Sequence, residues 1–398
     1  MKTNQIHVIN SRTEPFIWTP AATATSEMFW RWGEDNMFPA TLLQMAQRST
    51  VHRRILNDKA DYISGKGFSY ASGSAALADF VRTANGRGES LRKVFRRLAF
   101  DKLLFGNAFM EVVTDGRGSF LSFFHHDAST CRLSRDGNSA ILHGEWNRFT
   151  TKEMKRLPLY PSFAASRDGT MRSMVHFKSY EPMMEHYGVP SYVAGMNACS
   201  ITYKTDRWNI SRLDNSFQMS GVMILDGSVE SDRQASEIVR NAESKFAGRP
   251  GQVMFVVKDA SGQENSKFIP ITTSTEGDWR SLHSQATDDI VVAHSWFRTL
   301  SGLDYGAGFS AERVTYEYEI ALNTIILPQQ EEMLEQLRCV IGKMLSLDAS
   351  SLDIINIPPT KSNPQYMKVW EARKDDGLDY DPTDATQQLY LSQLLQKS

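Results

Sequence analysis

Two adjacent histidines, His125 and His126, are followed by Asp127 and Cys131, and these residues are the best suited of the chain to metal chemistry. Imidazole nitrogens, carboxylates and thiolates are the groups that hold catalytic metal ions in proteins. Neighbouring side chains of a strand point to opposite faces of a sheet, so the two histidines cannot bind one ion without a bulge. We therefore expect no metal site here. A metal-dependent phosphodiesterase or nuclease built on residues 125–136 stands only as an alternative.

Other residues of catalytic type lack the pattern that their chemistry requires. Asp288 and Asp289 lie in a predicted helix, where consecutive side chains diverge by about 100° and do not converge on one metal ion. The glycines of residues 302–308 could cradle a phosphate before a helix, but no Gly-Lys-Ser/Thr follows, which excludes a P-loop. No Gly-x-Ser-x-Gly elbow marks a nucleophilic serine. We therefore expect no catalytic residues and no cofactor, and not an enzyme.

Composition narrows the classes of protein further. The chain has 398 residues, 41% of them hydrophobic, which is enough for the cores of two or three domains. A net charge of -2 argues against a protein coated in nucleic acid, which would carry an excess of Lys and Arg. Three isolated cysteines favour a reducing cytoplasm. Without an apolar N-terminal segment or a run of about eighteen apolar residues, neither export nor a membrane span is expected.

The elements that position these residues begin with helices and continue with strands. Residues 1–25 are polar and interrupted by prolines, which indicates an extended arm. Apolar residues at helical spacing predict amphipathic helices over 40–63 and 91–104. A mostly β region follows over 108–180, with hairpin turns at Gly116, Gly118, Gly137 and Gly169. This order predicts an α+β fold.

The middle of the chain alternates long helices with short strands. The turn Tyr187-Gly188-Val189-Pro190 precedes a predicted helix over 191–220, and a strand follows at 222–225. A helix over 231–247 and strands over 251–257 and 267–271 complete a small β-α-β-β unit. A second long helix over 278–296 would return antiparallel to the first, and aromatic residues of these segments are expected to pack between helices or subunits: Trp208, Trp279, Trp296 and Phe297.

The last third contains a glycine-rich segment and one long helix. Glycine disfavours helix, so residues 298–310 are predicted to form a mobile loop. The following helix, over 312–345, should bend near Leu327-Pro328, because Pro328 lacks an N–H group and clashes with the preceding turn. An edge strand over 352–357 and a short helix over 366–375 complete the chain.

The order of several short segments resembles that of tailed-phage portal proteins of the HK97-like family. In the first third these segments are Gly33-Glu34-Asp35-Asn36-Met37-Phe38-Pro39, Lys59-Ala60-Asp61-Tyr62-Ile63-Ser64-Gly65-Lys66-Gly67-Phe68 and Asp101-Lys102-Leu103-Leu104-Phe105-Gly106-Asn107-Ala108-Phe109-Met110-Glu111. The Tyr-Gly-Val-Pro turn, the long helix after it and the later helix broken at Pro328 follow in the family's order. No single segment is specific, and the resemblance depends on their succession over most of the chain.

The resemblance implies a portal fold with an α/β wing, long antiparallel stem helices, a small α/β clip between them and a short helical C-terminal region. The implied parts are an arm (1–25), the wing (26–190), the first stem helix (191–220), the clip (221–277), the second stem helix (278–297), the tunnel loop (298–310), a long kinked wing or crown helix (311–347), and a C-terminal strand with a small crown (348–398).

The resemblance also implies a function. Portal proteins form a ring, here implied to be a dodecamer, at one capsid vertex of a phage or prophage, and double-stranded DNA is packaged and ejected through it without sequence recognition. The implied partners are the terminase large subunit, head-completion or adaptor proteins, and the major capsid and scaffold proteins. The implied location is the virion, after assembly in the bacterial cytoplasm. A ring-forming adaptor without a channel is a second alternative.

Three groups of site residues follow from position alone. In the tunnel loop, residues expected near DNA are Arg298, Ser301, Asp304, Tyr305 and Ser310. On the second stem helix, Asp288 and Asp289 are expected to face the channel and keep its wall repulsive to DNA. In the clip, the residues expected to dock terminase or an adaptor are Asp232, Arg233, Arg240, Lys245 and Lys258.

Overall fold

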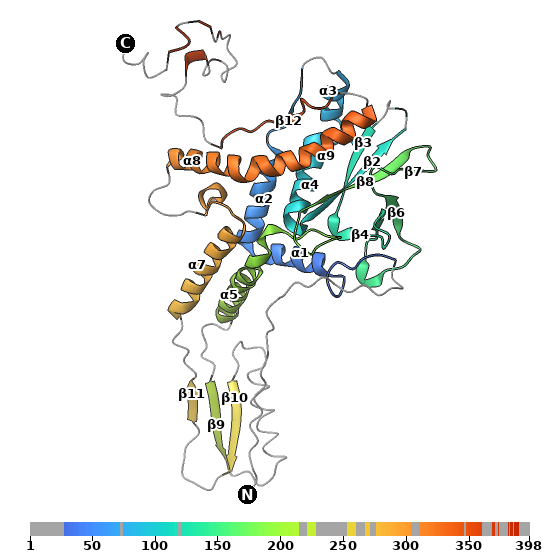
Figure 1. Cartoon of the computed structure of the whole chain (residues 1–398). Coiled ribbons are helices and arrows are strands. Elements are labelled where there is room, and N and C mark those ends of the chain that lie inside the picture. Colours follow the sequence, from blue (N-terminus) through green and yellow to red (C-terminus); the bar gives the residue numbers. More distant parts are fainter. Residues whose placement is uncertain are drawn as a thin grey trace. The chain divides into compact units, whose positions relative to one another are not determined.

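The computed structural model of the protein contains helices and sheets in two compact units (Figure 1). Unit 1 comprises Met1–Ala194 and Val291–Ser398, and unit 2 comprises Gly195–Ile290. This mixture confirms the predicted α+β class. The residues that the structure describes are 28–71, 75–115, 117, 121–214, 221–227, 253–259, 267–270, 276–303, 310–345, 348–359, 368–370, 373, 381, 383–384 and 386–389. The predicted arm, residues 1–25, lies outside them.

Unit 1 begins with two helices where one was predicted over 40–63. Helix α1 (Phe38–Arg48) and helix α2 (Thr50–Ser64) are separated by Ser49, whose backbone is extended at φ -101° and ψ 112°. The single-helix prediction is therefore wrong at this point. Ser and Thr are weak helix formers because their side chains compete for backbone hydrogen bonds, and here a Ser-Thr pair stands at the break.

Helix α3 (Ala75–Arg82) leads to α4 (Leu91–Phe105), which confirms the helix predicted over 91–104. The Ser90 side chain accepts a hydrogen bond from the Lys93 N–H at the start of α4. Gly106, in the left-handed conformation at φ 70°, ends the helix. These two residues are common helix boundaries for physical reasons: the serine oxygen satisfies a terminal N–H, and glycine has no Cβ to clash.

The central sheet of unit 1 is antiparallel, with strand order β3-β2-β8-β7. Its strands are β2 (Asn107–Thr114), β3 (Leu121–His126), β7 (Ala164–Ala165) and β8 (Met171–Lys178). Every residue of β2 is buried, as expected for a middle strand. Helix α4 packs against β2 and β3, and the phenylalanines Phe95, Phe109 and Phe123 of these three elements are fully buried. Each such phenylalanine contributes about 1.5–3 kcal/mol by burial.

A second antiparallel sheet has strand order β4-β5-β6, from Cys131–Leu133, Ser139–Leu142 and Lys155–Pro158. The predicted hairpin turns at Gly137 and Gly169 are confirmed, since each glycine adopts a left-handed φ, of 70° and 78°, between paired strands. Gly116 and Gly118 fall outside the described ranges. Together the two sheets account for the β region predicted over 108–180.

The C-terminal part of unit 1 is built on one long, irregular helix. Helix α8 (Ala311–Ala321) passes through a π-helical turn, labelled η5 (Leu322–Ile326), into α9 (Leu327–Leu345). The Leu327 N–H donates to the Leu322 carbonyl, a bond one residue longer than in an α-helix. The irregularity was predicted at Leu327-Pro328 and occurs in the turn immediately before Pro328, where proline disturbs the hydrogen bonding.

The predicted edge strand over 352–357 is shorter than expected. Only β12 (Asp353–Ile354) is a strand, and it pairs antiparallel with β1 (Phe68–Ser69). Of the short helix predicted over 366–375, only Lys368, Val369, Trp370 and Arg373 are described, and the last three are helical. Among the described helices, none is long and apolar enough to cross a membrane. Cys131 and Cys199 are buried and Cys339 is exposed, and no disulfide joins them.

Unit 2 contains helix α5 (Met196–Asp214), most of helix α7 (Glu276–Ala293) and a small sheet. The Trp208 and Trp279 rings stack with centroids 5.1 Å apart, and Asp206 lies 3.6 Å from His283. Trp208 follows Asp206 on α5, whereas its partner Trp279 precedes His283 on α7. The two helices therefore run antiparallel. Helix α5 starts five residues after the predicted start, because Ser191–Gly195 form a 3-10 turn, η3.

The sheet of unit 2 has strand order β10-β9-β11, from β9 (Gly221–Gly227), β10 (Val253–Asp259) and β11 (Lys267–Pro270). Strands β9 and β10 are parallel, and β11 is antiparallel to β9. A parallel pair needs a long crossover between its strands. That connection, with the predicted helix over 231–247, lies outside the described residues.

Candidate functional site

Two of the segments that carry the resemblance to portal proteins contact each other in unit 1. Asn107 lies at the start of β2, and Gly188 lies in the turn before η3. The Asn107 side chain donates to the Gly188 carbonyl at 2.8 Å and accepts from the Gly188 N–H at 2.8 Å. A Cβ on Gly106 would collide with the backbone of Val189, and one on Gly188 would collide with the Gly106 carbonyl. Both glycines are therefore required by close backbone approach.

Two tyrosines hold the same turn in place. The Tyr187 hydroxyl donates to the Trp30 carbonyl and accepts from the Leu133 N–H, at 2.8 and 2.9 Å. The Tyr187 ring stacks on Trp32 with centroids 4.6 Å apart. Tyr192 donates to the Leu104 carbonyl at the end of α4, at 2.6 Å. The segment that leads into α5 is thus fixed to α4, β2 and β4.

The other two segments of the resemblance also have structural roles. Asn36, at φ 63°, accepts hydrogen bonds from the Trp32 N–H and from the guanidinium of the buried Arg132. Gly65, at φ 55°, leaves no room for a Cβ beside Ile354 and Ile355. The quoted segments therefore position the fold of unit 1.

A buried cluster that the sequence did not reveal joins α2 to the residues just after α7. His52 Nδ1 lies 2.7 Å from His294 Nε2, and the Lys59 ammonium donates to the His294 carbonyl at 2.9 Å. The Tyr192 ring stacks on His294 with centroids 5.0 Å apart. Burial lowers the pKa of His52 to about 4 and that of Lys59 to about 8. Burial also lowers the pKa of His294 well below its usual value.

The predicted tunnel loop is not a loop over its first residues. Thr299–Ser301 form a 3-10 helix, η4, whose three residues are buried, with Gly302 ending it at φ 63°. The Ser301 hydroxyl accepts a hydrogen bond from the Trp296 indole at 3.0 Å. Ser301 is therefore part of the core of unit 1, and its expected position near DNA stays a prediction. Burial of Leu300 explains why this segment is helical although its glycine content predicted a loop.

Two of the other expected tunnel residues, Arg298 and Ser310, lie among the described residues. Arg298 is half-buried and precedes η4. Ser310 caps α8, since its side chain accepts from the Arg313 N–H at 3.1 Å. Asp304 and Tyr305 lie outside the described residues.

On α7, Asp288 and Asp289 are both exposed, whereas Ala286 and Ile290 are buried. That Asp288 and Asp289 face a channel stays a prediction. Helix α7 ends at Ala293 and not near residue 297, because Ser295 adopts φ 48°. The expected docking residues Asp232, Arg233, Arg240 and Lys245 lie outside the described residues, and for Lys258 only its place in β10 is known.

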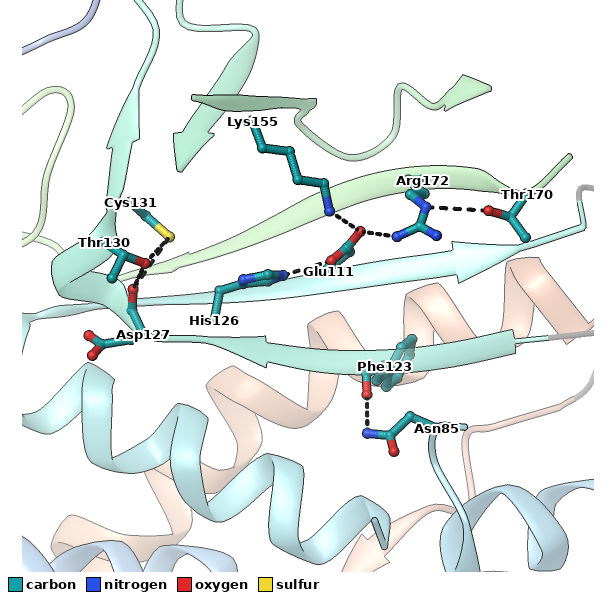
Figure 2. Close-up of polar contacts among 10 residues, drawn as sticks. All are labelled: Asn85, Glu111, Phe123, His126, Asp127, Thr130, Cys131, Lys155, Thr170 and Arg172. Atoms are coloured by element: carbon teal, nitrogen blue, oxygen red, sulfur yellow. Dashed lines mark hydrogen bonds and ion pairs between the residues drawn. The ribbon is translucent and has the colours of Figure 1, made fainter. Parts of the chain in front are cut away.

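The two adjacent histidines lie on opposite faces of the sheet, as predicted. His125 Nε2 contacts the Asp101 carboxylate of α4 at 2.8 Å, and His126 Nε2 contacts the Glu111 carboxylate of β2 at 2.7 Å. Cys131 donates to the Asp127 carbonyl in the following turn (Figure 2). Within the described part of the chain, no three side chains of metal-binding type come together.

Glu111 is the centre of a charged network that the sequence analysis missed (Figure 2). Its carboxylate accepts from His126 at 2.7 Å, from Lys155 at 3.0 Å and from Arg172 at 3.0 Å. Burial alone would raise the pKa of Glu111, but hydrogen bonds from His126 and Lys155 and the nearby charges hold it at about 2. A single carboxylate within the apolar strand Asn107–Thr114 is the signal that could have identified this network.

Known proteins with similar sequences include two probable portal proteins of phages. The chain is 23% identical over 229 residues to the probable portal protein of Haemophilus phage HP1, covering 57% of this chain and 63% of that protein. It is 21% identical over 244 residues to the probable portal protein of Escherichia phage P2, covering 61% and 65%. The chain thus spans just under two thirds of the length of the curated relatives that it matches. No family model matches the chain.

Solved structures with a similar fold come from gene transfer agent particles. A chain in the neck of the empty particle superposes with a TM-score of 0.55 at 16% identity, covering 86% of this chain and 94% of that one. A chain in the neck of the native particle, obtained with C12 symmetry, gives a TM-score of 0.52 over the same shares. This likeness shows a shared fold. With the matches to HP1 and P2, it confirms the resemblance to portal proteins.

Proposed function

We propose that the protein is a portal subunit of a tailed phage or prophage. The observation that carries this proposal is a fold shared over 86% of the chain with a chain of a particle neck. Sequence similarity to two probable portal proteins supports it independently. The subunits form a ring at one capsid vertex, and double-stranded DNA enters and leaves the particle through the ring.

In a ring, each subunit contacts its two neighbours through two different surfaces. The same head-to-tail interface is repeated between successive subunits until the last subunit meets the first. A count of twelve is supported by the C12 symmetry of the gene transfer agent neck that shares this fold. Binding to DNA in the channel is weak and independent of sequence, since phosphate contacts carry no sequence information. The net charge of -2 suits a channel through which DNA slides.

Within the subunit, α5 and α7 act as the two stem helices and the β9–β11 sheet belongs to the clip. Their antiparallel pairing, seen at Trp208 and Trp279, supports this assignment. The exposed Asp288 and Asp289 keep the channel wall repulsive to DNA. Residues 302–310, which follow the buried η4, supply the tunnel loop, and Arg298 at its base makes the phosphate contact.

The partners follow from the portal role. The terminase large subunit docks on the clip during packaging and a head-completion or adaptor protein replaces it, while capsid and scaffold proteins surround the wing. The clip residues assigned to docking are Asp232, Arg233, Arg240, Lys245 and Lys258. The mature protein belongs to the virion after assembly in the bacterial cytoplasm, and it performs no catalysis itself.

Light scattering on the purified protein, with negative-stain electron microscopy of the same sample, tests the proposal. We expect rings with a central hole and a mass near twelve times the 45.0 kDa of one chain. If the protein stays monomeric, the measurement is repeated with capsid and scaffold protein, which nucleate portal assembly. A protein that is monomeric under both conditions is not a portal subunit.

A further inference from the structure

A pocket of about 280 Å³ opens on the face of the central sheet that carries Glu111. Strand pairing explains its lining, because Glu111 of β2 pairs with Phe124 of β3 and lies on the same face as His126 and Arg172. The residues that line it and bear on the argument are Arg87, Glu111, Phe124, His126, Lys155 and Arg172. Three of these are permanent cations and one is a carboxylate.

The carboxylate at the base of the pocket is already satisfied. One oxygen of Glu111 accepts from Lys155 and Arg172, and the other accepts from His126. The Glu111 side chain is only 5% exposed, whereas those of Lys155 and Arg172 are 46% and 26% exposed. The cations therefore form the accessible wall of the pocket, and Glu111 fixes them in position.

Lys155 and Arg87 have N–H groups that can donate to a further acceptor. An ammonium group has three N–H donors, and within the described part of the chain a single carboxylate oxygen is within hydrogen-bond distance of Lys155. Arg172 is shared between Glu111 and Asp168. The Arg87 guanidinium lies over the Phe124 ring, 5.3 Å from its centroid, and Arg87 is exposed. Among the described residues no carboxylate pairs with Arg87, so the pocket carries a net positive charge.

This chemistry selects an oxyanion. A cation would be repelled, and an apolar group would leave the donors of Arg87 and the remaining donors of Lys155 without acceptors. Duplex DNA needs several cations spaced along its backbone, and a pocket of this volume admits one group. A carboxylate fits, because Arg87 can bind both of its oxygens.

The chain itself carries carboxylates that could fill the pocket of another copy. Glu312, Glu319 and Glu335 are exposed along α8 and α9. A ring requires two different and complementary surfaces on each subunit, and a basic pocket with an acidic helix meets that requirement. Charge complementarity of this kind also fixes the register between subunits.

We infer that the pocket at Glu111 receives an acidic side chain of the neighbouring subunit in the ring, with Arg87 and Lys155 as its ligands. This inference rests on the proposed ring and adds a specific contact to it.

Zero-length crosslinking tests the contact directly. Rings are assembled from equal amounts of unlabelled and ¹⁵N-labelled protein, treated with a carbodiimide that joins touching amines and carboxylates, and analysed by mass spectrometry. We expect crosslinked peptides of Lys155 with mixed isotope labels, which arise only between subunits. Lys152, exposed and three residues away, is the reference amine. Lys155 crosslinks confined to one label, while other mixed crosslinks form, would overturn the inference and leave the proposed function intact.

Charge reversal supplies a second readout. Arg87→Glu should raise the concentration at which half of the protein is assembled by roughly tenfold or more, because like charges then face each other. Arg148→Glu makes the same charge change at an exposed residue outside the pocket and should not. Thermal melting of both variants separates assembly from folding. Equal assembly of the two variants contradicts the inference alone, and a wild-type protein that never forms rings contradicts it together with the proposed function.

Discussion

His52 Nδ1 and His294 Nε2 lie 2.7 Å apart in the interior of unit 1, joining α2 to the residue that follows α7. Such a pair is stable when both rings are neutral, because one nitrogen then donates and the other accepts. Protonation would place a charge beside the Arg53 and Lys59 side chains, whose repulsion already contributes to the low pKa of His52 and His294. The contact is therefore sensitive to acid.

Stability should fall as the pH drops from about 6.5 to about 4. The unfolded chain takes up a proton on His52 near pH 6.5, whereas the folded pKa is about 4. Between these values the unfolded state binds more protons, so the free energy of unfolding decreases with falling pH. The loss attributable to His52 is on the order of 3 kcal/mol. Urea denaturation at pH 7.5 and pH 4.5 measures it.

The matched control for this prediction is His52→Gln, which does not titrate. Its stability should change less between the two pH values than that of the wild type. An identical change in both proteins would mean that His52 does not contribute to the acid sensitivity.

A methyl group on Gly188 should destabilise unit 1 strongly. Gly188→Ala forces the turn away from the Gly106 carbonyl and breaks the two hydrogen bonds with Asn107. Buried groups left without partners cost about 1–3 kcal/mol each. Gly144→Ala is the control, since nothing lies within 4 Å of its added methyl group. Similar melting temperatures for the two variants would show that the contact between Asn107 and Gly188 is not important for stability.

Neutralising Glu111 should cost about 2 kcal/mol, because its hydrogen bonds to charged partners are lost. Glu111→Gln leaves Lys155 without its counter-charge, and Arg172 keeps only that of Asp168. Glu153→Gln, whose side chain is 76% exposed, is the control and should change stability little. Urea denaturation at pH 7 compares the two variants with the wild type. The difference between Glu111→Gln and the wild type should shrink toward pH 2, where wild-type Glu111 itself becomes protonated.

Replacing Arg298 should impair DNA packaging without preventing ring formation. Arg298→Ala removes the proposed phosphate contact at the base of the tunnel loop, and we expect a several-fold loss of DNA retained in particles. Arg148→Ala, an exposed arginine in unit 1, is the matched control. DNA per particle is measured after nuclease treatment. Unchanged retention in Arg298→Ala rings would refute this role of Arg298.

The sequence predicted those elements whose boundaries depend on local residues. Ser90 and Gly106 bound α4, and Gly137 and Gly169 mark hairpins, because capping and left-handed turns depend on a few neighbouring residues. The break at Ser49 was not predicted because Ser and Thr also occur inside helices, so a Ser-Thr pair alone is a weak signal of a helix end. The 3-10 helix η4 was not predicted because it depends on burial of Leu300 in unit 1, where η4 contacts α2, which is distant in sequence.

The contacts that define the candidate site could not be predicted in this way. Asn107 and Gly188 are 81 residues apart in sequence, and His52 and His294 are 242 apart. Neither pair has a local pattern, since each depends on how α2, α4 and the turn before η3 pack together. The family resemblance contained both Asn107 and Gly188 but gave no reason for them. The structure supplies that reason as a direct backbone contact.

A cryo-electron microscopy map of the purified assembly tests the central claim most directly. The portal account predicts a closed ring with a continuous axial channel wide enough for duplex DNA, lined in part by α7 with Asp288 and Asp289 toward its axis. A closed ring without such a channel would contradict the account and favour a ring-forming adaptor that binds only proteins.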